Sequence, residues 1–234
     1  MYTFESRIRY SEADMNDRLT IESLLDYFQD CSTFHSEDLG LGVDYLRKKH
    51  LAWVLNAWQI DVERFPKVAE YVRIGTAPYG FKGFIGYRNF LMESREGERL
   101  ACASTIWTLL DLESGKPVTP PPEMKEKYIC EEKLDMEYLP RKIKLPENGE
   151  TRSSVMVARH HLDTNHHVNN GQYVRMALDE MPDHILARRL RVEYKNQAHL
   201  GTEIIPVYYQ EESKYIVSLN DVEQVPYAIV EITT

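Results

Sequence analysis

The chain has 234 residues, enough for one large domain or two small ones. A hydrophobic fraction of 43% and a charged fraction of 28% are ordinary for a globular protein and exclude disordered, collagen-like and coiled-coil compositions. The net charge of -9 argues against a whole-protein attraction to nucleic acid or to an anionic membrane. The 3 scattered cysteines indicate a reducing cytoplasm rather than a disulfide framework. We expect neither a targeting leader nor a membrane span, because no suitable basic or apolar segment occurs.

An internal repeat organises the chain. Residues 14–20 and 163–169 share the pattern Asp-x-Asn-x-basic-aliphatic followed by a residue that can cap a helix. Apolar residues then recur with helical spacing after each copy, so we predict helices that begin after the N-caps Thr20 and Asn169. Gly40 is expected to end the first helix and Pro182 the second.

Alternating apolar residues predict strands around both helices. The expected strands are 3–10, 58–62, 72–76, 85–89, 100–110, 153–158, 190–194, 204–209, 215–219 and 227–232. Each half therefore has a short strand, one helix and a run of antiparallel strands, which indicates an α+β fold in two tandem copies. Between the halves the chain is rich in Pro, Lys and Glu. We expect an N-terminal domain at 1–118, a connection at 119–146 and a C-terminal domain at 147–234.

The second copy carries a recognisable motif. Residues 162–173 read Leu-Asp-Thr-Asn-His-His-Val-Asn-Asn-Gly-Gln-Tyr. This resembles the signature Leu-Asp-x-Asn-x-His-Val-Asn-Asn-x-x-Tyr of plant-type fatty acyl-ACP thioesterases. In the first half, Trp53-Val54-Leu55, Arg64-Phe65-Pro66 and the alternating residues of 60–62 and 70–76 resemble the same family. The resemblance implies a tandem double hotdog fold, and because we expect no plastid leader, the chain resembles a bacterial member of the family.

The chain departs from the family after the second predicted helix. The family has Glu-Tyr-x-x-Glu-Cys there, whereas residues 193–198 read Glu-Tyr-Lys-Asn-Gln-Ala. Gln197 replaces a carboxylate and Ala198 replaces a cysteine. A cysteine nucleophile is therefore excluded at this position.

The candidate catalytic residues are Asp163, Asn165, His167 and Gln197. If residues 163–167 are extended, their period-two spacing turns Asp163, Asn165 and His167 to one side. His167 would be the general base, since an imidazole titrates near neutral pH. Asp163 would orient the base or hold the water, and Asn165 or the following helix N-terminus would donate to the oxyanion. Gln197 can position a water or a carbonyl. The alternative is that Asp163 and Asn165 are turn residues bonded to local backbone.

A metal site is a competing interpretation of the histidines at 160, 161, 166 and 167. The segment has no helical His-x-x-x-His pair, so we expect neither a metal nor another cofactor.

The first copy is expected to support the fold and the acyl chain rather than the chemistry. Arg18 occupies the position of His167, and a guanidinium stays protonated and cannot act as a base. The candidate lining of an acyl pocket is Met15, Phe28, Trp53 and Trp58, with plain hydrophobic core as the alternative.

The resemblance implies hydrolysis of fatty acyl-ACP to free fatty acid and ACP in the cytoplasm, with acyl carrier protein as the partner. The alternatives are an acyl-CoA thioesterase, a metal-dependent hydrolase and a non-catalytic acyl-binding protein, the last of which the change from Glu to Gln at Gln197 leaves open. Basic clusters at 47–49, 141–142 and 188–191 could meet an acidic carrier or be solvated surface. A monomer and a homodimer both remain open.

Overall fold

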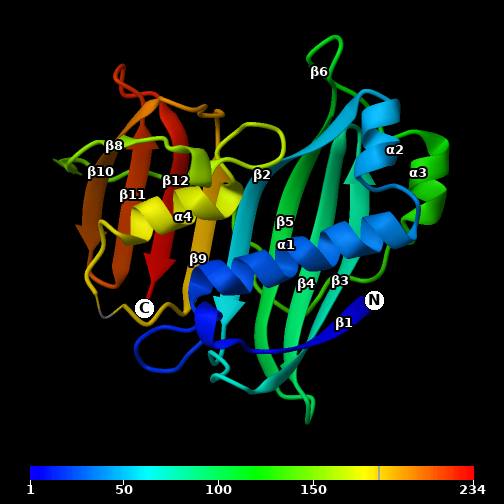
Figure 1. Cartoon of the computed structure of the whole chain (residues 1–234), viewed down its shortest axis with the longest axis horizontal. Coiled ribbons are helices and arrows are strands. Elements are labelled where there is room, and N and C mark those ends of the chain that lie inside the picture. The colour runs from blue at the N-terminus through cyan, green and yellow to red at the C-terminus, as the bar shows by residue number, and fades with distance from the viewer. Residues whose placement is uncertain (184) are drawn as a thin grey trace. The chain divides into compact units, whose positions relative to one another are not determined.

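The computed structural model describes residues 1–183 and 185–234. The chain divides into two compact units, Met1–Tyr138 and Leu139–Thr234. In each unit one helix lies across one face of an antiparallel sheet (Figure 1). The expected tandem α+β architecture is therefore confirmed.

The sheet of the first unit has the strand order β1-β3-β4-β5-β2, with β6 paired to β5, and α1 crosses one of its faces (Figure 1). Every pairing in this sheet is antiparallel. Its elements are β1 Tyr2–Arg7, α1 Ile21–Asp38, α2 Val43–Lys48, β2 Leu51–Val62, β3 Tyr71–Lys82, β4 Ile85–Ser94, β5 Arg99–Asp111, β6 Lys116–Pro117 and α3 Pro122–Lys127.

Helix α1 begins and ends where the sequence predicts. The Thr20 side chain accepts a hydrogen bond from the Ser23 N–H at 3.2 Å, which satisfies one free donor of the first turn. The side chains that α1 turns toward the sheet include Phe28 and Cys31, both 0% exposed. After the helix, Gly40 adopts a left-handed φ of 66°, a conformation that glycine takes without steric cost.

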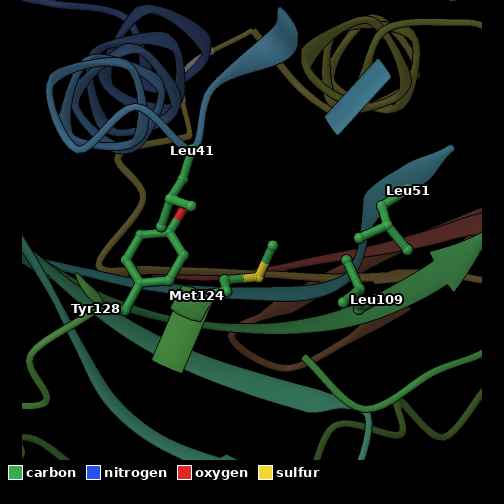
Figure 2. Close-up of a cluster of buried hydrophobic side chains, with 5 residues drawn as sticks. All are labelled: Leu41, Leu51, Leu109, Met124 and Tyr128. Carbon is green, nitrogen blue, oxygen red and sulfur yellow. The ribbon is translucent and has the colours of Figure 1, made fainter. Parts of the chain in front are cut away.

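Aromatic rings form the core under α1. The ring of Phe28 lies 6.2 Å from that of Trp58 and 5.4 Å from that of Phe90, and the rings of Trp58 and Phe90 are 5.0 Å apart. Beyond the end of α1 a second buried cluster continues this core, and α3 contributes to it (Figure 2). Its members are Leu41, Leu51, Leu109, Met124 and Tyr128.

The segment expected as a connection, 119–146, makes contacts on either side of the boundary between the two units, which falls after Tyr138. The Gln59 side-chain amide donates to the Glu137 carbonyl at 2.7 Å inside the first unit. Inside the second unit, the Ile143 N–H donates to the carboxylate of buried Glu193 at 3.0 Å.

The second unit repeats the plan with a shorter helix. Its sheet has the order β9-β12-β11-β10-β7, with β8 paired to β10. Helix α4 lies across β9, β12 and β11 (Figure 1) and buries Tyr173, Val174, Met176 and Ala177. The elements are β7 Glu150–Thr151, β8 Val155–Met156, α4 Asn170–Leu178, β9 Arg189–Tyr194, β10 Glu203–Glu211, β11 Lys214–Asn220 and β12 Pro226–Thr233. No helix in the described ranges is long and apolar enough to span a membrane.

Several details differ from the expectations, among them one helix and the end of one strand. Helix α2 was not predicted, because its 6 residues are too few to show a helical repeat of apolar positions. The first strand ends at Arg7 instead of Tyr10, because Tyr10–Glu12 form a 3-10 turn.

Phe28→Ala should lower the free energy of unfolding of the first unit by about 3–5 kcal/mol, because it leaves a cavity among buried rings. Phe34→Ala on the same helix, where the side chain is 43% exposed, should cost no more than about 1 kcal/mol. Urea unfolding followed by tryptophan fluorescence measures both, since Trp53, Trp58 and Trp107 all lie in the first unit. Equal losses would contradict this account of the core.

Candidate active site

The motif of the second copy forms a tight loop. An isolated antiparallel bridge joins Leu162 to Val168, and the Asp163 N–H donates to the His167 carbonyl at 2.8 Å. Asp163 Oδ1 accepts two backbone hydrogen bonds, from the Asn165 N–H at 2.8 Å and from the His167 N–H at 3.1 Å. His166 sits at the turn in the left-handed region, with φ 62°.

The expectation of an extended segment with alternating side chains is therefore wrong. An aspartate side chain that accepts from backbone two and four residues ahead stabilises a turn instead of a strand. Asp163 is half-buried and Asn165 is exposed. Among the described residues, the hydrogen bonds to the Asp163 carboxylate come from backbone N–H groups. Asp163 thus organises the loop that carries His167.

The loop leads directly into α4. The Asn169 side chain accepts from the Gly171 N–H at 2.8 Å, so the expected N-cap is confirmed. The Asn169 N–H donates to the His161 carbonyl at 2.9 Å. The positive end of the helix dipole is therefore adjacent to the motif loop.

A second imidazole lies beside His167. The ring centroids of His167 and His199 are 4.8 Å apart, with an angle of 58° between the ring planes. His167 is half-buried, whereas His199 is exposed. The sequence reasoning missed His199. Its only signal was that it follows Gln197 by two positions, in the stretch where the chain departs from the family.

Backbone contacts hold this second segment against the motif. The Val168 N–H donates to the Ala198 carbonyl at 3.0 Å, and the Ala198 N–H donates to the Tyr173 hydroxyl at 2.9 Å. The His199 N–H donates to Thr202 Oγ1 at 3.1 Å. Gln197 belongs to the same segment and is exposed. The segment after β9 thus places the His199 ring next to the motif loop, and the backbone of Ala198, the residue after Gln197, bonds to that loop.

The first copy builds the same loop without the imidazole. Asp14 Oδ1 accepts from the Asn16 N–H at 2.8 Å and from the Arg18 N–H at 3.0 Å. Asp17 has φ 58°, and Ala13 bridges to Leu19 as Leu162 does to Val168. The internal repeat is therefore a repeat of structure. Arg18 is exposed at the position equivalent to His167.

The four pocket candidates fall into different environments. Met15 is 85% exposed at the tip of the first loop. Phe28 and Trp58 are buried under α1, and Trp53 is half-buried against Phe81, with 6.3 Å between the rings.

The remaining histidines of the motif region make local contacts. The rings of His160 and His161 are 4.1 Å apart, and His161 Nδ1 accepts from the Ala158 N–H at 3.0 Å. Burial and the neighbouring His160 lower the pKa of His161. Within residues 1–183 and 185–234, no group of 3 or more His, Cys, Asp or Glu side chains is arranged to hold a metal ion.

The cysteines differ in exposure and lie in the first unit. Cys31 and Cys102 are buried, and Cys130 is exposed. Burial raises the pKa of the Cys31 thiol to about 12, so this thiol is not ionised at neutral pH.

Comparison with known proteins covers both units. Residues 1–128 match the acyl-ACP thioesterase N-terminal domain, and residues 145–231 match the acyl-ACP thioesterase C-terminal domain. A chloroplastic acyl-[acyl-carrier-protein] hydrolase of Cuphea viscosissima is 26% identical over 216 residues, which are 83% of this chain and 51% of the relative. The chain thus spans about half the length of this curated relative.

Solved structures show the same fold. An acyl-ACP thioesterase from Bacteroides thetaiotaomicron superimposes with a TM-score of 0.90 at 23% identity, over 99% of this chain and 96% of that one. A 1,4-dihydroxy-2-naphthoyl-CoA thioesterase from Synechocystis matches 54% of this chain and 94% of its own, with a TM-score of 0.51 at 13% identity. A single hotdog therefore accounts for about half of this double hotdog chain. With both of its domain models matched, the chain belongs to the acyl-ACP thioesterase family.

Proposed function

We propose that this chain hydrolyses the thioester of fatty acyl-ACP, releasing a free fatty acid and the ACP thiol. The observation that carries the proposal is the family motif in the second copy, with His167 on a loop fixed by Asp163 and packed against His199. Acyl carrier protein is the proposed partner and the cytoplasm the proposed compartment, in line with three free cysteines.

The proposed reaction uses water directly. His167 takes a proton from a water whose oxygen attacks the thioester carbonyl carbon, and the imidazolium then protonates the departing thiolate as the carbon–sulfur bond breaks. Asn165 and the N-terminus of α4 are the proposed donors to the oxyanion. Gln197 is proposed to position the water, since its amide cannot accept a proton as a base. The Cys31 thiol, buried and with a raised pKa, is unsuited to be a nucleophile.

The deciding experiment measures thiol release from acyl-ACPs of graded chain length, with the matching acyl-CoAs in parallel, and identifies the released fatty acids. Faster turnover of acyl-ACP supports the proposal. Faster turnover of acyl-CoA would reassign the substrate. Binding of acyl-ACP without thiol release would indicate the non-catalytic acyl-binding function that the change from Glu to Gln at Gln197 leaves open.

His167→Ala should lower turnover by about 10²–10⁴-fold, because it removes the proposed general base. Arg18→Ala is the matched control at the equivalent loop position of the first copy, and its turnover should stay within about tenfold of the parent. Circular dichroism checks that both variants fold. A larger loss for Arg18→Ala than for His167→Ala would contradict the assignment of the chemistry to the second copy.

Asp163→Asn should lower turnover by about a hundredfold while the loop persists, because an amide oxygen can still accept the two backbone hydrogen bonds but carries no charge. Asp14→Asn makes the same change in the first copy and should leave turnover unchanged. The unfolding temperature of each variant checks that the loop is intact, and the rate of thiol release measures turnover. Near-normal turnover of Asp163→Asn would reduce this residue to a purely structural role.

His199→Gln should lower turnover by about ten- to a hundredfold, less than the loss at His167, because it removes the imidazole that packs on the proposed base. His160→Gln replaces another exposed histidine of the same unit and should have no effect. If both variants matched the parent, the contact between His167 and His199 would have no part in turnover.

A further inference from the structure

The Tyr173 hydroxyl anchors the segment that follows β9. Tyr173 lies on α4 and is 3% exposed, and Ala198 is 1% exposed. The Ala198 N–H donates to the Tyr173 hydroxyl at 2.9 Å. Residues 195–199 form neither helix nor strand, so this N–H has no place in a regular ladder. Because a buried N–H needs an acceptor, the hydroxyl satisfies a group that would otherwise be costly to bury.

Tyr173 is itself held in place. Its ring meets the Tyr194 ring edge to face, with 6.0 Å between the centroids and an angle of 63°. The Tyr194 hydroxyl donates to the Asn170 carbonyl at 3.0 Å, which joins β9 to the first turn of α4. Burial raises the pKa of Tyr173 to about 12, so its hydroxyl stays protonated at neutral pH. Tyr173 is therefore a fixed hydrogen-bonding group and does not carry protons.

The first copy holds the equivalent segment without a hydroxyl. The Leu19 N–H donates to the Pro66 carbonyl at 2.9 Å, as the Val168 N–H does to the Ala198 carbonyl at 3.0 Å. Pro66 is thus the equivalent of Ala198. A proline has no N–H, so the first copy needs no acceptor at this place.

The helix position that supplies the hydroxyl differs between the copies in the same sense. Leu24 lies four residues after the N-cap Thr20, as Tyr173 lies four residues after the N-cap Asn169. Leu24 is 1% exposed, so an apolar side chain is enough to fill this position in the core. The hydroxyl occurs in the copy that has an N–H to satisfy, which indicates that it serves the Ala198 backbone and not the packing of the helix.

The residue after the anchored one lies beside the motif side chain in both copies. In the first copy Arg18 and Lys67, the residue after Pro66, form an isolated antiparallel bridge. His167 and His199 occupy the equivalent positions, and their ring centroids are 4.8 Å apart. Paired residues of antiparallel segments face the same side. The place of the His199 ring therefore depends on where the backbone directly before it is held.

We propose that Tyr173 is a positioning residue for the proposed hydrolysis, because its hydroxyl fixes Ala198 and thereby holds His199 against His167. Tyr173 acts through the backbone and needs no contact with the substrate. The effect on turnover rests on the proposed function, whereas the placement of His199 can be measured without any substrate.

The first test uses nuclear magnetic resonance of the protein alone. The Ala198 amide should be protected from hydrogen exchange in the parent, and the rings of His167 and His199 should show a nuclear Overhauser contact. Tyr173→Phe removes the hydroxyl alone and should speed exchange of the Ala198 amide at least about tenfold and weaken the ring contact. Tyr209→Phe removes another half-buried hydroxyl of the same unit and should change neither.

Unchanged exchange of the Ala198 amide in Tyr173→Phe would overturn the proposal, as would an unchanged ring contact. If Tyr173→Phe does not fold, the parent decides, and an Ala198 amide that exchanges as fast as an exposed one overturns the proposal.

The second test measures turnover of acyl-ACP. Tyr173→Phe should lower kcat by about tenfold or more and leave KM within about twofold, because a displaced group slows the chemistry without weakening binding. The double variant Tyr173→Phe/His199→Gln should be no slower than His199→Gln alone, since the hydroxyl acts through His199. A kcat of Tyr173→Phe equal to that of the parent would overturn the role in turnover, as would fully additive losses in the double variant. If the parent releases no thiol, the proposed hydrolysis fails, and amide exchange and the ring contact still decide whether Tyr173 places His199.

Discussion

One carboxylate oxygen that accepts two backbone hydrogen bonds underlies both copies of the repeat. Oδ1 of Asp14 and Oδ1 of Asp163 each draw together the N–H groups two and four residues ahead. This contact bends the chain through a left-handed residue and delivers it to the cap of the following helix. The helix can then cover its sheet, and the residue two positions before the cap is held at a fixed place. The position of His167 is thus a consequence of a backbone contact.

Local patterns predicted the architecture well. The caps at Thr20 and Asn169 and the stop at Gly40 follow from contacts within a few residues, so the sequence contains them. The strands follow from alternation that a half-buried sheet requires. The loop conformation was not predicted correctly, because residue spacing alone does not distinguish an extended segment from a turn closed by its own aspartate. The alternative that treats Asp163 as a turn residue describes its hydrogen bonds correctly.

The features that could not be predicted from the sequence depend on contacts between segments that are distant in the chain. His199 meets His167 only because Val168 bonds to Ala198 and Ala198 bonds to Tyr173, and none of these contacts has a sequence signal. Arg88 likewise looks like any arginine on a strand until its surroundings are known. Its burial and its histidine neighbour depend on α1, β3 and Tyr128 together. Such features arise from tertiary packing, which no single segment encodes.

The way the two loops are held also bears on how such a protein can diverge. Their geometry depends on one aspartate and on backbone groups, whereas the tip side chains Met15 and Asn16 in one copy and Thr164 and Asn165 in the other are exposed. Those side chains can drift under mutation at little cost to folding. The side chain directly before Leu19 or Val168 can also change without altering the loop. One copy carries Arg18 there and the other carries His167, and both backbones make the same hydrogen bond to the aspartate. After duplication, one copy of such a loop can lose or acquire chemistry while the architecture is inherited intact.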